Sequence, residues 1–174
     1  MLKKIIFTFM IVLALSSIVL AGYVYFEPEP IKITYTTDYF TIEYDSLDSY
    51  INSGSEATTH LFFFCCVSDN DCQYIENTLF TSVDKEDPTI NTKETIEYVE
   101  ISEVVARNEF NLVQKKWNIT NYPAFVSCTI NNGEITFNNQ LIWDPESSLS
   151  VADIITWFSD NNIGSTENVK PMTD

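Results

Sequence analysis

An apolar run that breaks into a polar turn and then a cysteine constrains the fold of this chain most strongly. The run Leu61–Cys66 is wholly apolar and rich in phenylalanine, which is typical of a strand buried on both faces of a sheet. The polar turn Ser68–Asp71 follows, and Cys72 then opens a segment with helical spacing. Helix N-termini carry unpaired N–H groups and a positive dipole end, which stabilise a thiolate. The stretch therefore predicts a central strand, over Thr58–Cys65, that delivers a cysteine to a helix N-terminus.

The rest of the chain predicts strands and helices in alternation. Asn70 and Gln73 favour a capping box at the start of the helix that carries Cys72, and Asn131–Gly133 is typical of a hairpin turn. The expected strands lie at residues 31–42, 58–65, 95–101, 124–129 and 134–137. The expected helices begin near Ser46, Asp71, Ser102 and Ser150, and the third of them runs to Trp117. An acidic loop is expected at 84–92. This order predicts an α/β domain with a central mixed sheet of four to five strands and helices on both faces.

The N-terminal segment has the pattern of a membrane-directed sequence. Lys3 and Lys4 precede an uncharged run of 22 residues that ends at Phe26. The core of a signal peptide has about 7–15 residues, whereas a helix needs about 20 to span a bilayer. Residues 1–26 therefore predict a signal anchor, and a signal peptide cut after Ala21 is the alternative, which would leave the protein secreted. The lysines place the N-terminus in the cytoplasm and the domain outside, attached to the membrane through the N-terminal helix.

The net charge excludes one class of ligand, and the composition along the chain indicates where the domain begins and ends. The net charge of −16 excludes nucleic acid as a ligand, because phosphates repel such a surface. We expect a stalk or leading strand at 27–37, a folded domain at 38–164 and a disordered tail at 165–174. The expected partner is a peptide or a protein, and the sequence does not indicate the oligomeric state.

Four cysteines carry the candidate chemistry. Outside the cytoplasm Cys65, Cys66, Cys72 and Cys128 can form disulfides, and four cysteines allow three full pairings. Cys72 can pair with Cys65 or with Cys66 across the turn, either as a structural staple or as a redox-active disulfide, and Cys128 is expected to be an inert core residue. His60 is the only histidine and there is no Cys-x-x-Cys zinc knuckle, so we expect no metal and no cofactor.

Three segments between Asp38 and Ile163 resemble the thioredoxin family. They are the strand, turn and helix around Cys72, the segment Lys116–Phe125 that leads into a proline, and the closing hairpin and helix that begin at Gly133. Membrane-tethered thioredoxin-like proteins of bacteria, including those named as bacteriocin-transport accessories, share this plan. The resemblance implies a thioredoxin-like fold in which Pro123 is cis. It also implies that Tyr122, beside the Cys72 turn, can pair with an extended peptide.

The chain departs from the family at the position of the nucleophilic cysteine. The resemblance places Cys72 at the family's second cysteine, so Asp69 stands where the first would be, and a carboxylate cannot attack a disulfide. Strand alternation places Cys65 on the face that the family turns toward the helix cysteine, which favours Cys65 over Cys66 as the partner of Cys72.

Two functions follow from this departure. The first is an extracytoplasmic protein that lacks the Cys-x-x-Cys pair and binds a peptide or protein next to the cis-proline loop, in secretion or envelope maturation. The alternative is an atypical thiol–disulfide oxidoreductase that uses Cys72 with Cys65 or Cys66. Only under the alternative is the protein an enzyme.

Overall fold

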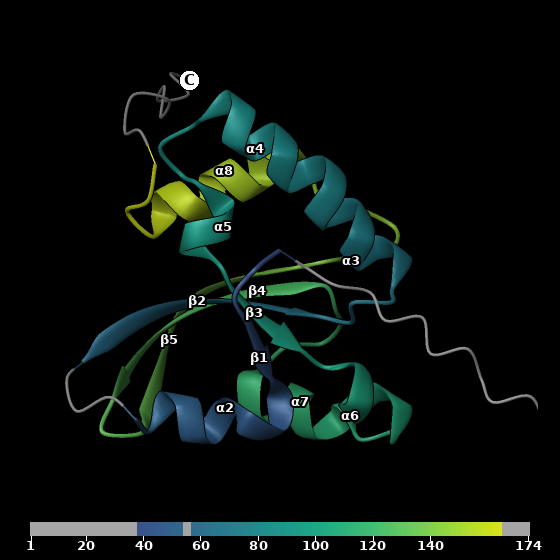
Figure 1. Ribbon diagram of the computed structural model, residues 1–174, viewed down its shortest axis with the longest axis vertical. Coiled ribbons are helices and arrows are strands. Elements are labelled where there is room, and N and C mark those ends of the chain that lie inside the picture. The colour runs from purple at the N-terminus through teal and green to yellow at the C-terminus, as the bar shows by residue number, and fades with distance from the viewer. Residues whose placement is uncertain (1–37, 54–56, 165–174) are drawn as a thin grey trace, which may run out of the picture. The chain divides into compact units, whose positions relative to one another are not determined.

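The computed structural model of the chain describes residues 38–53 and 57–164 (Figure 1). The segments predicted at 1–26, 27–37 and 165–174 lie outside the described residues. None of the helices within the described ranges has the length and the apolar character that a membrane-spanning helix needs.

A five-stranded mixed sheet forms the centre of the domain, as predicted. Its strands are β1 (Thr41–Glu43), β2 (Thr58–Cys65), β3 (Glu97–Glu100), β4 (Ala124–Asn131) and β5 (Glu134–Ile142), in the spatial order β1-β3-β2-β4-β5. Strands β1, β3 and β2 are parallel, whereas β4 is antiparallel to both β2 and β5. The hairpin turn at Asn132 and Gly133 has positive φ angles of 50° and 80°, which glycine and asparagine adopt at low cost.

Helices cover both faces of the sheet (Figure 1). On one face lie α3 (Asn70–Tyr74), the π-helix η1 (Ile75–Phe80), α4 (Thr81–Glu86), α5 (Thr92–Thr95) and α8 (Val151–Asp160), and on the other lie α2 (Tyr44–Ile51), α6 (Ser102–Ala106) and α7 (Phe110–Trp117). The predicted layers are therefore confirmed.

Strand β2 supplies side chains to both cores, as its continuous apolar run predicts. Leu61 and Phe63 pack under α3, α4 and α8, whereas Phe62 and Phe64 pack against α2 and α7. The three phenylalanines are fully buried. Because parallel strands covered on both faces contact no water, the alternation of polar and apolar residues is absent from β2.

Several predicted boundaries were wrong, including the end of the last strand, which continues to Ile142 rather than stopping at residue 137. The single helix expected from Ser102 to Trp117 is two helices, because the chain turns at Asn108, which has a φ of 57°. The left-handed backbone at Asn108 ends the helical hydrogen bonding and changes the direction of the chain. The acidic loop expected at 84–92 is shorter, since α4 continues to Glu86.

Ser150 caps α8, and its removal should have a measurable cost. Its Oγ accepts a hydrogen bond from the N–H of Asp153 at 3.2 Å, and Asp153 Oδ2 accepts one from the N–H of Ser150 at 2.8 Å. We expect Ser150→Ala to lower the free energy of unfolding by about 1 kcal/mol, measured by urea denaturation. Ser148→Ala, at an exposed position just before the cap, is the control. Equal stability of the two variants would contradict the capping role.

Candidate functional site

The Asp69 carboxylate joins the turn after β2 to the start of α3. The N–H of Asp69 donates to the carbonyl of Cys66 at 2.9 Å, and Asp69 Oδ1 accepts from the N–H groups of Asp71 at 2.9 Å and Cys72 at 3.1 Å. Asp69 is therefore the N-cap of α3, and the capping box predicted at Asn70 was wrong by one residue. Gln73, the other predicted member, instead donates from Nε2 to the carbonyl of Val67 at 3.1 Å.

Cys65 and Cys72 form a disulfide where the end of β2, the turn at residues 66–69 and the start of α3 meet, a region called the corner below. It joins the last residue of β2 to the first turn of α3, with a Cα–Cα distance of 5.8 Å and a separation of 7 residues in the sequence. Both side chains are fully buried. The pairing with Cys65 rather than Cys66, which strand alternation favoured, is confirmed.

This disulfide corrects the main functional prediction. That prediction held that a domain without the Cys-x-x-Cys pair has lost dithiol exchange and only binds a partner. The structure instead contains a cysteine pair at the same corner, because the end of β2 approaches the start of α3 closely enough for Cys65 to take the place of the missing cysteine. The first function, a binding protein that lacks the cysteine pair, is therefore wrong, and the alternative agrees with the geometry.

An aromatic cluster lies beneath the disulfide. The ring of Phe63 contacts those of Phe125, Phe80 and Tyr98, with centroids 4.7, 5.2 and 5.4 Å apart. These side chains belong to the same core as Cys65 and Cys72. A thiolate formed here would be in apolar surroundings, which disfavour charge, so the sulfurs are held in the neutral or disulfide form until the corner opens.

Cys66 is a free thiol on the opposite face of the sheet. Its side chain packs with Phe62 and Phe64, and 5% of its surface is exposed. Burial, followed by the nearby carboxylate of Glu100, raises the pKa of Cys66 to about 11. The predicted candidate Cys66 therefore lies beside the site, is not in the pair and is protonated at neutral pH.

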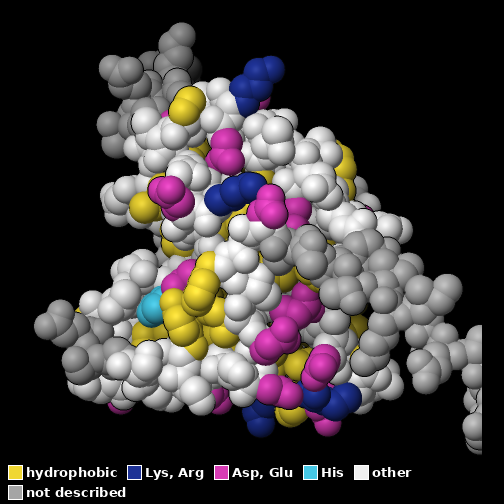
Figure 2. Space-filling model, viewed as in Figure 1, with side chains coloured by type: hydrophobic (Ala, Val, Ile, Leu, Met, Phe, Trp, Pro, Cys, Tyr) yellow, Lys and Arg dark blue, Asp and Glu magenta, His cyan; other side chains and the backbone are white. Residues whose placement is uncertain are grey.

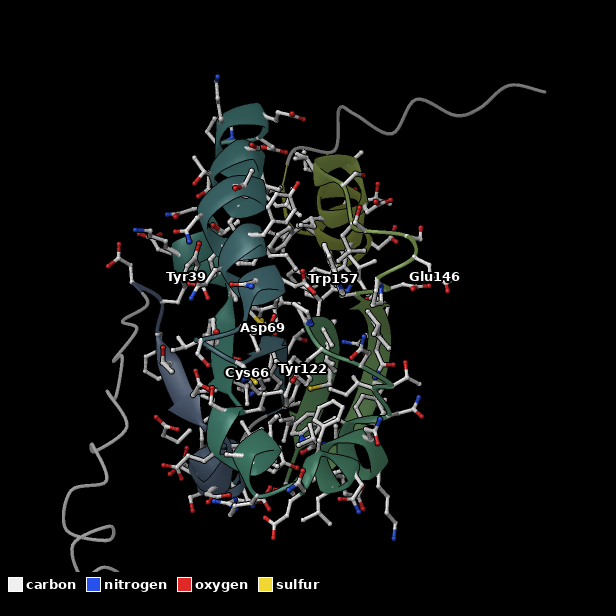
Figure 3. All side chains as sticks on the ribbon, turned by 90° about the vertical axis from the view of Figure 1, so that its right-hand side faces the viewer. Tyr39, Cys66, Asp69, Tyr122, Glu146 and Trp157 are labelled. Carbon is white, nitrogen blue, oxygen red and sulfur yellow. A yellow bond between two sulfur atoms is a disulfide. The ribbon has the colours of Figure 1, made fainter. Side chains whose placement is uncertain are left out.

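The proline loop reaches the same corner. The Tyr122–Pro123 peptide is cis, as the resemblance implied. Phe64 pairs with Ala124, so Pro123 lies next to the end of β2, where Cys65 is. Figure 3 shows Tyr122, Cys66 and Asp69 close together on the face turned to the viewer. Tyr122 packs against both cores, and burial together with the Cys66 sulfur raises its pKa to about 12.

Glu100 connects the turn that follows β2 to the other helical layer, a role that no sequence pattern indicated. Its Oε2 accepts from the N–H of Val67 at 3.0 Å, and its Oε1 accepts from the N–H of Ser102 at 2.7 Å. One carboxylate thus satisfies the backbone of the turn and of the first residue of α6. Only its position at the end of β3, parallel to β2, could have suggested this, because parallel strands end at the same edge.

His60 and Cys128 lie away from the corner. They face each other across β2 and β4, and His60 Nδ1 lies 2.8 Å from Glu97 Oε2. Burial raises the pKa of Cys128 to about 12. Within the described ranges no group of three or more histidines, cysteines and carboxylates is placed to hold a metal ion.

The negative charge of Asp69 should lower the reduction potential of the Cys65–Cys72 disulfide. The Asp69 carboxylate occupies the N–H groups at the start of α3 and adds a negative charge there, so it opposes a thiolate on Cys72 in the reduced protein. Asparagine also caps helices, so Asp69→Asn removes the charge and keeps the cap. We expect the reduction potential of the Cys65–Cys72 pair to rise by about 30 mV, which corresponds to about 1.4 kcal/mol.

This potential can be measured by equilibration with glutathione buffers and mass spectrometry of the thiols. Asp160→Asn, exposed at the end of α8, is the control for a general loss of charge. A potential that stays unchanged or falls in Asp69→Asn would show that the cap does not oppose the thiolate.

Comparison with known proteins gives structural neighbours only. The chain matches no protein-family model and no curated protein sequence. Among solved structures it is similar to thioredoxin of Plasmodium falciparum, with 15% identity, a TM-score of 0.44, and coverage of 76% of this chain and 95% of that one. It is also similar to thioredoxin of Trichomonas vaginalis, with 12% identity, a TM-score of 0.43, and coverage of 72% of this chain and 99% of that one. Thioredoxin f2 of Chlamydomonas reinhardtii has 13% identity, a TM-score of 0.44, and coverage of 71% and 95%.

The topology of the domain itself identifies the fold. Three parallel strands are followed by an antiparallel hairpin, helices lie on both faces, and the disulfide and the proline loop meet at the end of the central strand. Together these features show that the domain has a thioredoxin-like fold.

Proposed function

We propose that the domain is a thiol–disulfide oxidoreductase whose redox centre is the Cys65–Cys72 disulfide. The observation that carries the proposal is the position of the bond. It joins the end of a central strand to a helix N-terminus, beside the Tyr122–Pro123 loop. A bond placed only for stability could lie anywhere that two loops meet, whereas this one lies at the edge where α/β sheets bind their ligands.

The reaction is a two-electron exchange. A substrate thiolate attacks one sulfur of the Cys65–Cys72 bond, which breaks as a mixed disulfide forms, and the other cysteine leaves as a thiolate and takes up a proton. The second substrate thiolate then attacks the substrate sulfur of the mixed disulfide and releases the second cysteine. The substrate dithiol becomes a disulfide, and Cys65 and Cys72 become thiols. The same steps in reverse reduce a substrate disulfide.

The partner in this proposal is a peptide or protein that lies along the Tyr122–Pro123 loop. The domain works outside the cytoplasm, attached to the membrane through residues 1–26, or free after cleavage of that segment. The uncharged run that follows Lys3 and Lys4 supports this location, since disulfides persist in extracytoplasmic compartments.

The redox potential tests the proposal. The full chain is equilibrated in glutathione buffers, and its thiols are trapped and counted by mass spectrometry. A redox-active pair should have a potential within the range of glutaredoxins and thioredoxin, roughly −200 to −270 mV. A potential below about −300 mV would identify a structural bridge and overturn the proposal.

Catalysis of insulin reduction provides the second readout. Activity should be lost in Cys72→Ser and kept in Cys128→Ser, which changes a buried cysteine away from the corner. Loss of the bond also opens a short loop and should cost about 2 kcal/mol of stability. The assay is therefore run at a temperature at which Cys72→Ser remains folded.

A further inference from the structure

An aromatic pair near the disulfide consists of the exposed Tyr74 and the buried Trp143. Tyr74 follows Cys72 by two residues, and 45% of its surface is exposed. Its ring is 6.3 Å from that of Trp143 in an edge-to-face arrangement. The N–H of Trp143 donates to the carbonyl of Pro123 at 2.9 Å, so the pair reaches from α3 to the proline loop. A polypeptide bound beside the disulfide would contact the exposed ring of Tyr74, which Trp143 supports from below.

Carboxylates flank the aromatic pair on two sides. Asp69 and the exposed Asp71 lie at the start of α3, on the side of Tyr74. The exposed Asp144 and Glu146 follow Trp143, and Asp144 Oδ1 accepts from the N–H of Glu146 at 2.9 Å. Figure 3 shows Asp69 at the centre of this face and Glu146 at its edge.

The lysine and arginine side chains of the described residues form ion pairs away from the disulfide or lie on other helices. Lys93 pairs with Asp38, Lys116 with Asp48, and Arg107 with Asp45, Glu103 and Glu109. Within 38–53 and 57–164, no lysine or arginine forms an ion pair with Asp69, Asp71, Asp144 or Glu146. Figure 2 shows that acidic side chains are also spread over another face of the domain, 90° away from the view in Figure 3. Among the residues that the structure describes, no ion pair therefore neutralises these four carboxylates.

We propose that the substrate is a cationic polypeptide with lysine or arginine next to its reacting cysteine, an inference that rests on the proposed oxidoreductase function. The charge of −16 attracts such a chain over distances of a Debye length, about 10 Å at 0.1 M salt. At contact, its cations face Asp71 and Glu146, and a lysine or arginine can stack on the exposed ring of Tyr74. An anionic thiol is repelled by the same groups.

Three matched peptides test the charge preference. Each carries one cysteine, flanked by lysine, glutamine or glutamate, and reduces the oxidised full chain while the mixed disulfide is followed by quenched mass spectrometry. Each rate is divided by the rate of the same peptide with a neutral small-molecule disulfide, because flanking charge changes the reactivity of the peptide thiol itself. At low ionic strength we expect the lysine peptide to react about tenfold faster than the glutamine peptide, and the difference to disappear near 0.5 M salt.

Two double variants show whether the effect is local. Asp71→Asn with Glu146→Gln should reduce the preference for the lysine peptide several-fold. Glu86→Gln with Asp160→Asn removes the same charge from exposed positions on α4 and α8 and should leave the preference within a factor of two.

The possible failures are distinguishable. Equal normalised rates for the three peptides, or equal losses in the two double variants, would overturn the charge inference while the oxidoreductase function stands. Absence of exchange with every peptide would overturn both.

Discussion

Phe63→Ala is expected to lower the free energy of unfolding by about 3–5 kcal/mol. Phe63 is fully buried, and its ring contacts three other aromatic rings beneath the disulfide. Truncation removes the transfer free energy of the ring and leaves a cavity that the surrounding rings cannot fill. Urea denaturation of the oxidised protein measures the change.

Phe40→Ala is the matched control, since 57% of that side chain is exposed. We expect the control to cost less than about 1 kcal/mol. If Phe63→Ala costs no more than Phe40→Ala, the aromatic cluster does not support the corner as described.

The second large effect is a loss of stability in alkaline solution. Burial raises the pKa of Cys66 to about 11 and of Cys128 to about 12, whereas an unfolded cysteine has a pKa of about 8.5. Between these values the unfolded chain loses two protons that the folded chain keeps, so stability is complete below pH 8 and falls as the pH rises. We expect the free energy of unfolding to decrease by about 4 kcal/mol between pH 8 and pH 10 from these two thiols.

The double variant Cys66→Ala, Cys128→Ala separates this effect from the titration of buried tyrosines. Its free energy of unfolding should fall much less over the same pH range, even though its stability at pH 7 is lower. Unfolding is measured quickly, and the disulfide pairing is checked by mass, because thiolates attack disulfides at this pH. Parallel pH profiles for the two proteins would refute the assignment.

The sequence determined the architecture well because its signals are local and strong. The apolar run that becomes β2, the Asn132–Gly133 turn and the Ser150 cap each specify their element through backbone geometry or burial alone. The cis peptide before Pro123 came from the resemblance, since an X-Pro bond is cis in only about 5–6% of cases.

The chemistry of the site depends on contacts between separate segments, which the spacing of residues within one segment does not reveal. Counting back from Cys72 led to Asp69, and this linear comparison showed that the Cys-x-x-Cys motif was missing and suggested that dithiol exchange was lost with it. The fold brings Cys65 to within 5.8 Å of Cys72, measured between Cα atoms, because a strand end and a helix start converge there. The two hydrogen bonds of Glu100 likewise join segments from three elements, so no pattern within one segment could reveal them.

The complete burial of both sulfurs has a kinetic consequence. A substrate can react only with the fraction of molecules in which the turn from Cys66 to Asp71 has moved away, which breaks the hydrogen bond from Val67 to Glu100. If this excursion costs about 3 kcal/mol, roughly one molecule in a hundred is receptive at any moment. Small thiols would then react slowly, whereas a polypeptide whose binding energy holds the turn open would react fast. The site would therefore select substrates by how tightly they bind as well as by their charge.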